Sequence, residues 1–138
     1  MAVHTTGQSF RLALAKHGRE MPDEAMSDLA KAVAIRALRG VVMSTRVDTG
    51  RARGNWQVGE SMPPEGYDQS LAAPGGRSDA SIDRREDPIA RGNREIGRAS
   101  GLDIIWLHNG VPYIGILEDW DKMVAGDVAA LRTWLASG

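Results

Sequence analysis

The residue types that could do chemistry are most concentrated in one ten-residue segment, Val47–Trp56, which reads Val-Asp-Thr-Gly-Arg-Ala-Arg-Gly-Asn-Trp. Asp-Thr-Gly is a sequence typical of a tight turn. The Asp48 carboxylate can accept hydrogen bonds from nearby backbone amides in an Asx-turn, and Gly50 is free to take a positive φ. We therefore predict that Asp48 and Gly50 are structural residues of a turn.

Three arginines, Arg46, Arg51 and Arg53, flank this turn. They could contact DNA phosphates, where each contact adds salt-dependent affinity. They could instead pair with carboxylates of a neighbouring subunit, for which Glu118 and Asp119 are candidates. They could also be solvated. The formal net charge of −1 lacks the basic footprint of a nucleic-acid-binding protein and favours the structural or intersubunit role.

Catalytic alternatives start from the same aspartate. Asp48 could join Asp103, Glu118 and Asp119 in a carboxylate cluster for acid–base chemistry, but the spacing of His and carboxylate residues matches no common metal site. Aspartic proteases also use Asp-Thr-Gly, but they need two copies and this chain has one. His108 could be a general base, although a structural histidine fits better. We predict a protein that is not an enzyme and holds no metal or cofactor.

Composition limits the class of protein. The 138 residues, 42% hydrophobic and 25% charged, fit a single globular domain over 1–138. With no cysteine, the chain has no disulfides and no thiolate zinc site. The first residues do not resemble a signal peptide, and no apolar stretch is long enough to cross a membrane. Basic residues dominate 1–60 and acidic residues dominate 99–138, which suits head-to-tail contact between copies and equally suits ordinary solvated faces.

The elements that position the turn begin with two helices. A weak helix is expected over 7–18, within an N-terminal segment 1–22. Apolar residues at helical spacing predict a long helix over 23–45 with one buried face, and Gly40 marks a close-packing site in it. Alternation of side-chain type then predicts a strand over 53–61.

Further elements follow the strand. Residues 62–86, rich in Pro, Gly and Ser, predict a flexible loop or arm that orders on a partner. A helix is expected from 87 or 88 to 100, and a strand over 102–110 closed by Asn-Gly. Pro112 argues against a central strand in the next segment, where a short helical turn carrying Tyr113, Ile114 and Leu117 is an equal alternative to a strand. Asp127 is expected to cap a last helix over 128–136. This order predicts an α+β fold in which the long helix packs on a small, mainly antiparallel sheet.

The aromatic residues divide into two groups. We expect Trp56, Trp106 and Tyr113 to lie in the core beside the sheet. Trp120 and Trp134 belong to the terminal region and are the better candidates for anchoring an interface.

Two segments together resemble a known family. The first is 47–56, after a long helix; the second is 109–114 (Asn-Gly-Val-Pro-Tyr-Ile) followed by 117–119 (Leu-Glu-Asp), after a strand. The pair resembles the tail-completion and neck proteins of long-tailed bacteriophages, a class that includes minor tail components. The resemblance covers about 23–120. It departs from the family pattern at 120–126, where Gly and a Lys/Gln-Ala-Pro segment often follow the Glu-Asp pair.

The resemblance implies a small structural virion protein of the tail top or head–tail junction. Such subunits form rings, here expected to be hexameric, that complete the tail and help to join it to the capsid connector. The implied partners are tail-tube and head–tail connector proteins, with passing contact with packaged DNA. The implied location is the virion, and the host cytoplasm during assembly. The alternative is a small nucleic-acid-binding or regulatory domain using Arg46, Arg51 and Arg53.

Overall fold

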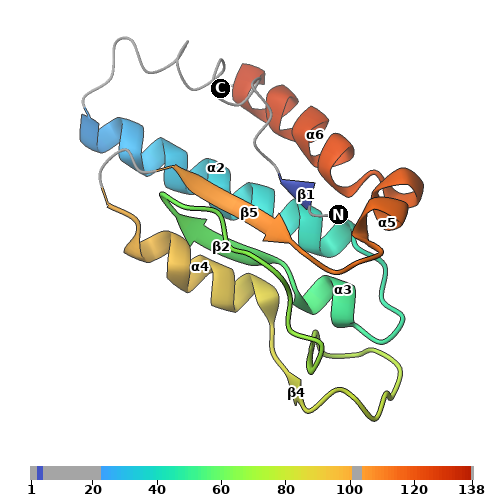
Figure 1. Cartoon of the computed structure of the whole chain (residues 1–138). Helices are drawn as coiled ribbons and strands as arrows, with labels where there is room; N and C mark the ends of the chain where they lie inside the picture. The colour runs from blue at the N-terminus through green and yellow to red at the C-terminus, as the bar shows by residue number, and fades with distance from the viewer. Residues whose placement is uncertain (1–2, 5–22, 101–103, 138) are drawn as a thin grey trace.

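The computed structural model describes residues 3–4, 23–100 and 104–137, so the helix expected over 7–18 lies outside the described residues. Three strands form an antiparallel sheet in the order β1 (Val3–His4), β5 (Ile105–Asn109), β2 (Gln57–Glu60). In the register of the central pair, Gln57 faces His108 and Glu60 faces Ile105. Figure 1 shows this small sheet in front of the long helix α2 (Asp23–Ser44).

Four further helices complete the described fold. They are α3 (Arg51–Gly54), α4 (Pro88–Arg98), α5 (Ile114–Asp121) and α6 (Met123–Ser137). Helix α4 packs against α2 and β2, whereas α6 packs along α2 on another side. The Asp87 carboxylate accepts a hydrogen bond from the Ile89 amide and caps α4. The expected α+β class is confirmed, as is the long helix packed on a small antiparallel sheet.

The core lies between α2 and the sheet. From Val33 onward the apolar stripe that predicted α2 is buried, with Leu38 and Val41 fully inside. Trp56 is buried as predicted. Its indole N–H donates to the Thr45 hydroxyl over 2.8 Å, and that hydroxyl lies 2.6 Å from the Val41 carbonyl oxygen. Trp56 thereby joins the start of β2 to the carboxyl end of α2.

Trp106 does not lie in the core as predicted. Side chains alternate along a strand, and Leu107 is the buried residue of β5 that joins the core. Trp106 therefore points to the other face of the sheet, where it is half-buried. Its indole N–H donates to the Ser61 carbonyl over 3.3 Å.

The strand predicted over 53–61 begins later, at Gln57. Residues 51–54 instead form the single helical turn α3, closed by hydrogen bonds from the Gly54 amide to the Gly50 carbonyl (2.8 Å) and from the Asn55 amide to the Arg51 carbonyl (3.1 Å). A Cβ at Gly54 would overlap the backbone of Ala72 and Ala73. Close approach of the loop 62–86 thus requires glycine here, and sequence alternation alone could not reveal it.

The last helix also begins earlier than predicted, at Met123, so Asp127 is not its N-cap. Lys122, with a φ of 50°, separates α5 from α6. The Glu118 carboxylate accepts hydrogen bonds from the amides of Val124 (2.7 Å) and Ala125 (3.2 Å), and so caps α6. Asp127 lies within the second turn of α6, and its side chain is buried, at 8% exposure.

The loop 62–86 forms a lobe beside α3, at the lower right of Figure 1. It contains two short parallel strands, β3 (Leu71–Ala72) and β4 (Arg84–Arg85). The Asn55 side chain donates to the carbonyls of Asp68 (3.0 Å) and Leu71 (3.1 Å), and its oxygen accepts from the Asp68 amide (2.7 Å). These bonds tie the lobe to the end of α3; its predicted flexibility stays a prediction.

Candidate functional site

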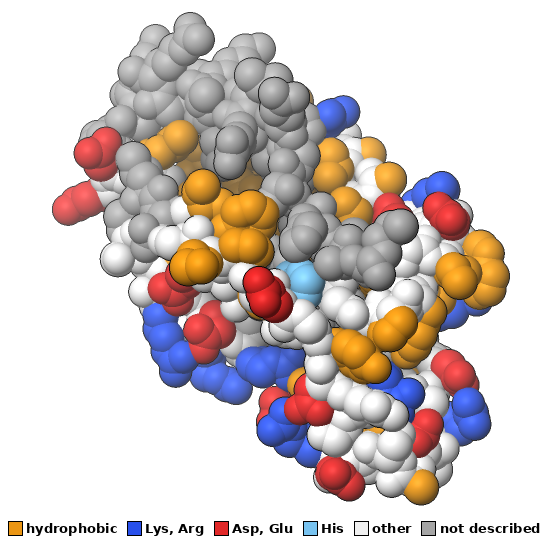
Figure 2. Space-filling view, in the orientation of Figure 1, with side chains coloured by type: hydrophobic (Ala, Val, Ile, Leu, Met, Phe, Trp, Pro, Cys, Tyr) orange, Lys and Arg blue, Asp and Glu red, His pale blue; other side chains and the backbone are white. Residues whose placement is uncertain are grey.

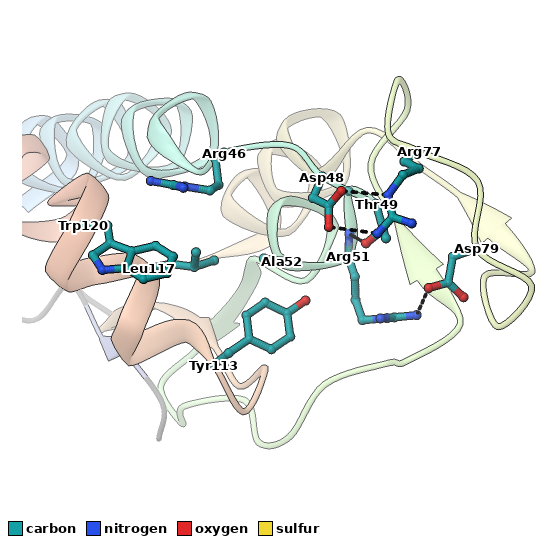
Figure 3. A pocket seen from close by; sticks show the side chains of 11 residues that line it. Arg46, Asp48, Thr49, Arg51, Ala52, Arg77, Asp79, Tyr113, Leu117 and Trp120 are labelled. Atoms are coloured by element: carbon teal, nitrogen blue, oxygen red, sulfur yellow. Dashed lines mark hydrogen bonds and ion pairs between the residues drawn. The ribbon is translucent and has the colours of Figure 1, made fainter.

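The two segments that carry the family resemblance form the walls of a single groove of about 540 Å³. The turn before α3 lies on one side, and α5 with the residue before it lies on the other (Figure 3). Loop 62–86 contributes two further charged residues. The lining residues are Arg46, Asp48, Thr49, Gly50, Arg51, Ala52, Arg77, Asp79, Tyr113, Leu117 and Trp120.

The turn is built on Gly50, which has a φ of 91° as predicted. Its carbonyl accepts hydrogen bonds from the Gly54 and Ala73 amides, at 2.8 and 2.9 Å. The Asx-turn role expected of Asp48 falls to Thr49, whose hydroxyl accepts from the Arg51 amide over 3.2 Å. A serine or threonine hydroxyl makes the same local bond as an aspartate, so the sequence alone did not decide between the two neighbours.

Asp48 instead reaches the lobe. Its carboxylate accepts two hydrogen bonds from the Arg77 guanidinium, at 2.9 and 3.1 Å (Figure 3). This bond holds the pKa of Asp48 below, and that of Arg77 above, its ordinary value. The predicted turn residue is therefore one half of an exposed ion pair.

Arg51 and Arg53 bind within the chain. Arg51 donates to the Gln69 carbonyl (2.9 Å) and to the Ser81 hydroxyl (2.5 Å), and lies 3.5 Å from Asp79. Arg53 points the other way and donates to backbone carbonyls at the carboxyl end of α2, those of Thr45 (2.9 Å) and Met43 (3.3 Å). A cation at this position satisfies carbonyls that the helix leaves unpaired. Arg53 is therefore a helix cap and does not line the groove.

Within the chain, Arg46 pairs with Asp121 at the end of α5, over 2.6 and 2.9 Å. Pairing with Glu118 or Asp119 of a neighbouring subunit stays a prediction. Its guanidinium also lies over the Trp120 ring, 5.0 Å from the centroid. Glu118 is engaged in the cap of α6, and Asp119 is exposed.

Every charged side chain that lines the groove therefore has a partner of opposite sign. The hydrogen bond from Arg46 lowers the pKa of Asp121. Bonds from the Ser81 hydroxyl and amide, with a smaller effect of Arg51, lower the pKa of Asp79. The three groove arginines are thus matched by three ionised carboxylates within the same chain.

The aromatic side chains at the groove are unlike the prediction in one respect. Tyr113, expected in the core, is 38% exposed and faces the groove. Helix α5 begins at the next residue, Ile114, and that residue is buried in the core instead. Partial burial raises the pKa of the Tyr113 hydroxyl. Trp120 is 64% exposed, as an interface candidate should be. Trp134 is half-buried against the core, with Arg36 over its ring at 4.6 Å.

Among the described residues, the carboxylate cluster considered as a catalytic alternative does not form around Asp48. Glu118 is used as a helix cap, and Asp103 lies outside the described residues. Within residues 3–4, 23–100 and 104–137, no three His, Asp or Glu side chains gather as a metal site would require. His108 is buried on the outer face of the sheet, with Nε2 3.2 Å from the Gly66 carbonyl oxygen. In the same described ranges, no helix combines the length and the apolar character that a membrane span needs.

Two charged groove residues, Arg77 and Asp79 in the loop, were not predicted from the sequence. Neither was Asp121 at the end of α5, which pairs with the groove residue Arg46. Nothing in the irregular loop sequence signals which of its charges meet the turn. Asp121 follows the Leu-Glu-Asp segment closely, so its proximity to the predicted interface residue Trp120 was the available signal. No family model, curated protein or solved structure matches this chain.

Proposed function

We propose that this chain is a structural subunit of a bacteriophage virion, placed at the tail top or the head–tail junction, where copies form a ring. The ring completes the tail and offers a face to the capsid connector. Its mechanism is binding, with no chemical step and no cofactor.

The observation that carries the proposal is the meeting of the two resembling segments. They are about sixty residues apart in the sequence, yet the turn at 46–52 and the residues 113–120 line the same groove. A surface built from both segments, with Trp120 and Tyr113 exposed beside arginines, has the composition of a protein–protein interface.

The alternative, nucleic-acid binding through Arg46, Arg51 and Arg53, has less support. Each of these arginines donates to a carboxylate, a hydroxyl or a backbone carbonyl of its own chain. Binding to a DNA phosphate would have to replace those bonds, and replacing a satisfied charged bond recovers little free energy. Strong DNA binding by the isolated protein that weakens steeply with salt would favour this alternative.

The decisive experiment measures the mass of the purified protein in solution, alone and with tail-tube protein. The proposal predicts closed oligomers, expected to be hexamers, and binding to the ends of tail tubes visible by electron microscopy. A protein that stays monomeric at every concentration and never joins tubes would overturn the proposal.

A further inference from the structure

Helix α5, which forms one wall of the groove, presents large apolar side chains to solvent. Ile116 and Trp120 on α5 are 53% and 64% exposed, and Tyr113 stands just before them. Figure 2 shows hydrophobic side chains gathered over α5, at the right of the view. Such side chains are stabilised when a partner removes them from water.

The charged residues of the groove are already paired within the chain, and this determines which kind of partner can bind there. Arg46 is held by Asp121, Arg77 by Asp48, and Arg51 by Ser81 and Asp79. A phosphate or an acidic peptide would have to compete with these internal pairs for every contact. An apolar side chain would not, because it needs only the ring and aliphatic surfaces. The groove therefore favours an apolar occupant.

A suitable occupant is exposed elsewhere on the same chain. Met62 is 77% exposed and Ile104 is 44% exposed. The Ser61 amide donates to the Ile104 carbonyl over 2.7 Å, so Ile104 and Met62, the residue after Ser61, lie at the same end of the sheet. These two exposed residues are hereafter called the Met62/Ile104 tip.

The backbone under this tip is strained. The Met62 amide donates to the Glu60 carbonyl over 2.7 Å, closing a γ-turn in which Ser61 has a φ of 63°. The positive-φ γ-turn is rare and costs free energy for a residue other than glycine. Strain of this kind concentrates at functional positions, and here it holds a methionine out into solvent.

The tip and the groove lie at opposite ends of the sheet. Strand β2 leads from Gln57, near the groove, to Glu60, beside the tip, and β5 runs antiparallel with Ile105 opposite Glu60. At about 3.3 Å per residue, the strands keep the two surfaces more than ~10 Å apart within one chain. Any contact between tip and groove must therefore join two copies.

We infer that the Met62/Ile104 tip of one copy occupies the groove of the next, with the Met62 thioether against the rings of Tyr113 and Trp120. Contact between two different surfaces is heterologous, and it generates a ring when the rotation from copy to copy closes. This inference rests on the proposed function and names the surfaces through which the ring forms.

The absence of cysteine from the sequence permits a direct test by disulfide cross-linking. The double variant Met62→Cys, Tyr113→Cys should form, on mild oxidation, a ladder of cross-linked dimers, trimers and larger species. Each single variant should stay uncross-linked, whereas a mixture of the two should stop at dimers. The matched control pairs Ile35→Cys, an apolar residue exposed on α2 outside both surfaces, with Tyr113→Cys and should give no ladder.

A second, non-covalent measurement uses substitutions at exposed positions, which leave folding intact. Met62→Ser and Trp120→Ser should each raise the dissociation constant between copies by roughly tenfold or more, whereas Ile35→Ser should leave it unchanged. Sedimentation velocity over a concentration series gives these constants, and circular dichroism confirms that each variant is folded.

The outcomes separate this inference from the proposed function. If the protein forms rings but the double variant cross-links no better than the Ile35 control, the inference is overturned and the proposed function stands. Dimers of Met62→Cys alone would also overturn it, because they would show tip-to-tip contact. A wild-type protein that is monomeric at every concentration overturns the ring itself, and with it the proposed function.

Discussion

Replacing Asp127 with asparagine should remove a pH dependence of stability that burial of this carboxyl creates. Asp127 lies on α6 where that helix packs against α2, and a Cβ at Gly40 would overlap its Oδ1 atom. Among the described residues, its Oδ2 atom is buried with no hydrogen-bond partner. Burial raises the pKa of the carboxyl to about 7, so the folded chain favours the protonated form.

The direction of this pH dependence follows from the pKa of Asp127 in the folded and in the unfolded chain. In the unfolded chain the pKa of this carboxyl is near its ordinary value of 3.8, whereas in the folded chain burial raises it to about 7. Between these values the folded state binds more protons, so its stability falls as the pH rises and levels off above about 7. Stability falls by ~1.4 kcal/mol for each pH unit in this window, so the loss between pH 5 and pH 8 is about 3 kcal/mol.

The assay is urea unfolding of wild type and Asp127→Asn at pH 5 and pH 8, followed by circular dichroism. The variant keeps the shape of the side chain without the charge, so the difference between the two proteins isolates Asp127 from every other titrating group. We expect the variant to be the more stable of the two at pH 8, with a stability difference about 3 kcal/mol more in its favour than at pH 5. An unchanged difference between pH 5 and pH 8 would refute the reasoning. Asp83→Asn, at an exposed position, is the matched control.

Three further substitutions test the packing. Gly40→Ala should destabilise the fold by about 1–3 kcal/mol in urea unfolding despite alanine's higher helix propensity, because the new methyl group meets Asp127; a gain in stability would contradict this contact. Gly50→Ala should cost ~1–3 kcal/mol in the same assay, since Gly50 has a φ of 91° and an added Cβ would lie 2.7 Å from the Ala73 carbonyl oxygen; a neutral result would mean that the turn can rearrange. Arg53→Ala should cost about 1–3 kcal/mol in thermal unfolding through two lost bonds to α2, without changing the salt dependence of self-association; a change in that dependence would place Arg53 at an interface.

Features set by local rules could be predicted from the sequence. The stripe of apolar residues predicted α2 to within one residue of its observed end, and the predicted close packing at Gly40 is confirmed by its contact with Asp127. The turn at Gly50 followed from its Asp-Thr-Gly context. In each case neighbouring residues along the chain carry the information.

Features that depend on contacts between residues far apart in the sequence could not be predicted from it. Trp106 and Leu107 are both apolar, and only pairing with β2 decides which of them faces α2. The helical turn α3 depends on the approach of Ala72 and Ala73 to Gly54. Asp127 looks like a helix cap in the sequence because aspartate favours that position; its burial follows from the packing of α6 on α2.

The partners of the three arginines around the turn also depend on residues far away in the sequence, and this affects the functional interpretation. In the sequence, Arg46, Arg51 and Arg53 form a basic cluster that suits DNA as well as a protein partner. The structure gives each of them acceptors in its own chain, two from regions at least eighteen residues away and one from the end of α2. Charge that is neutralised internally attracts phosphate weakly, whereas the aromatic rings beside it keep much of their surface in solvent. The recognition carried by this surface should therefore be apolar, with the ion pairs fixing the shape of the groove.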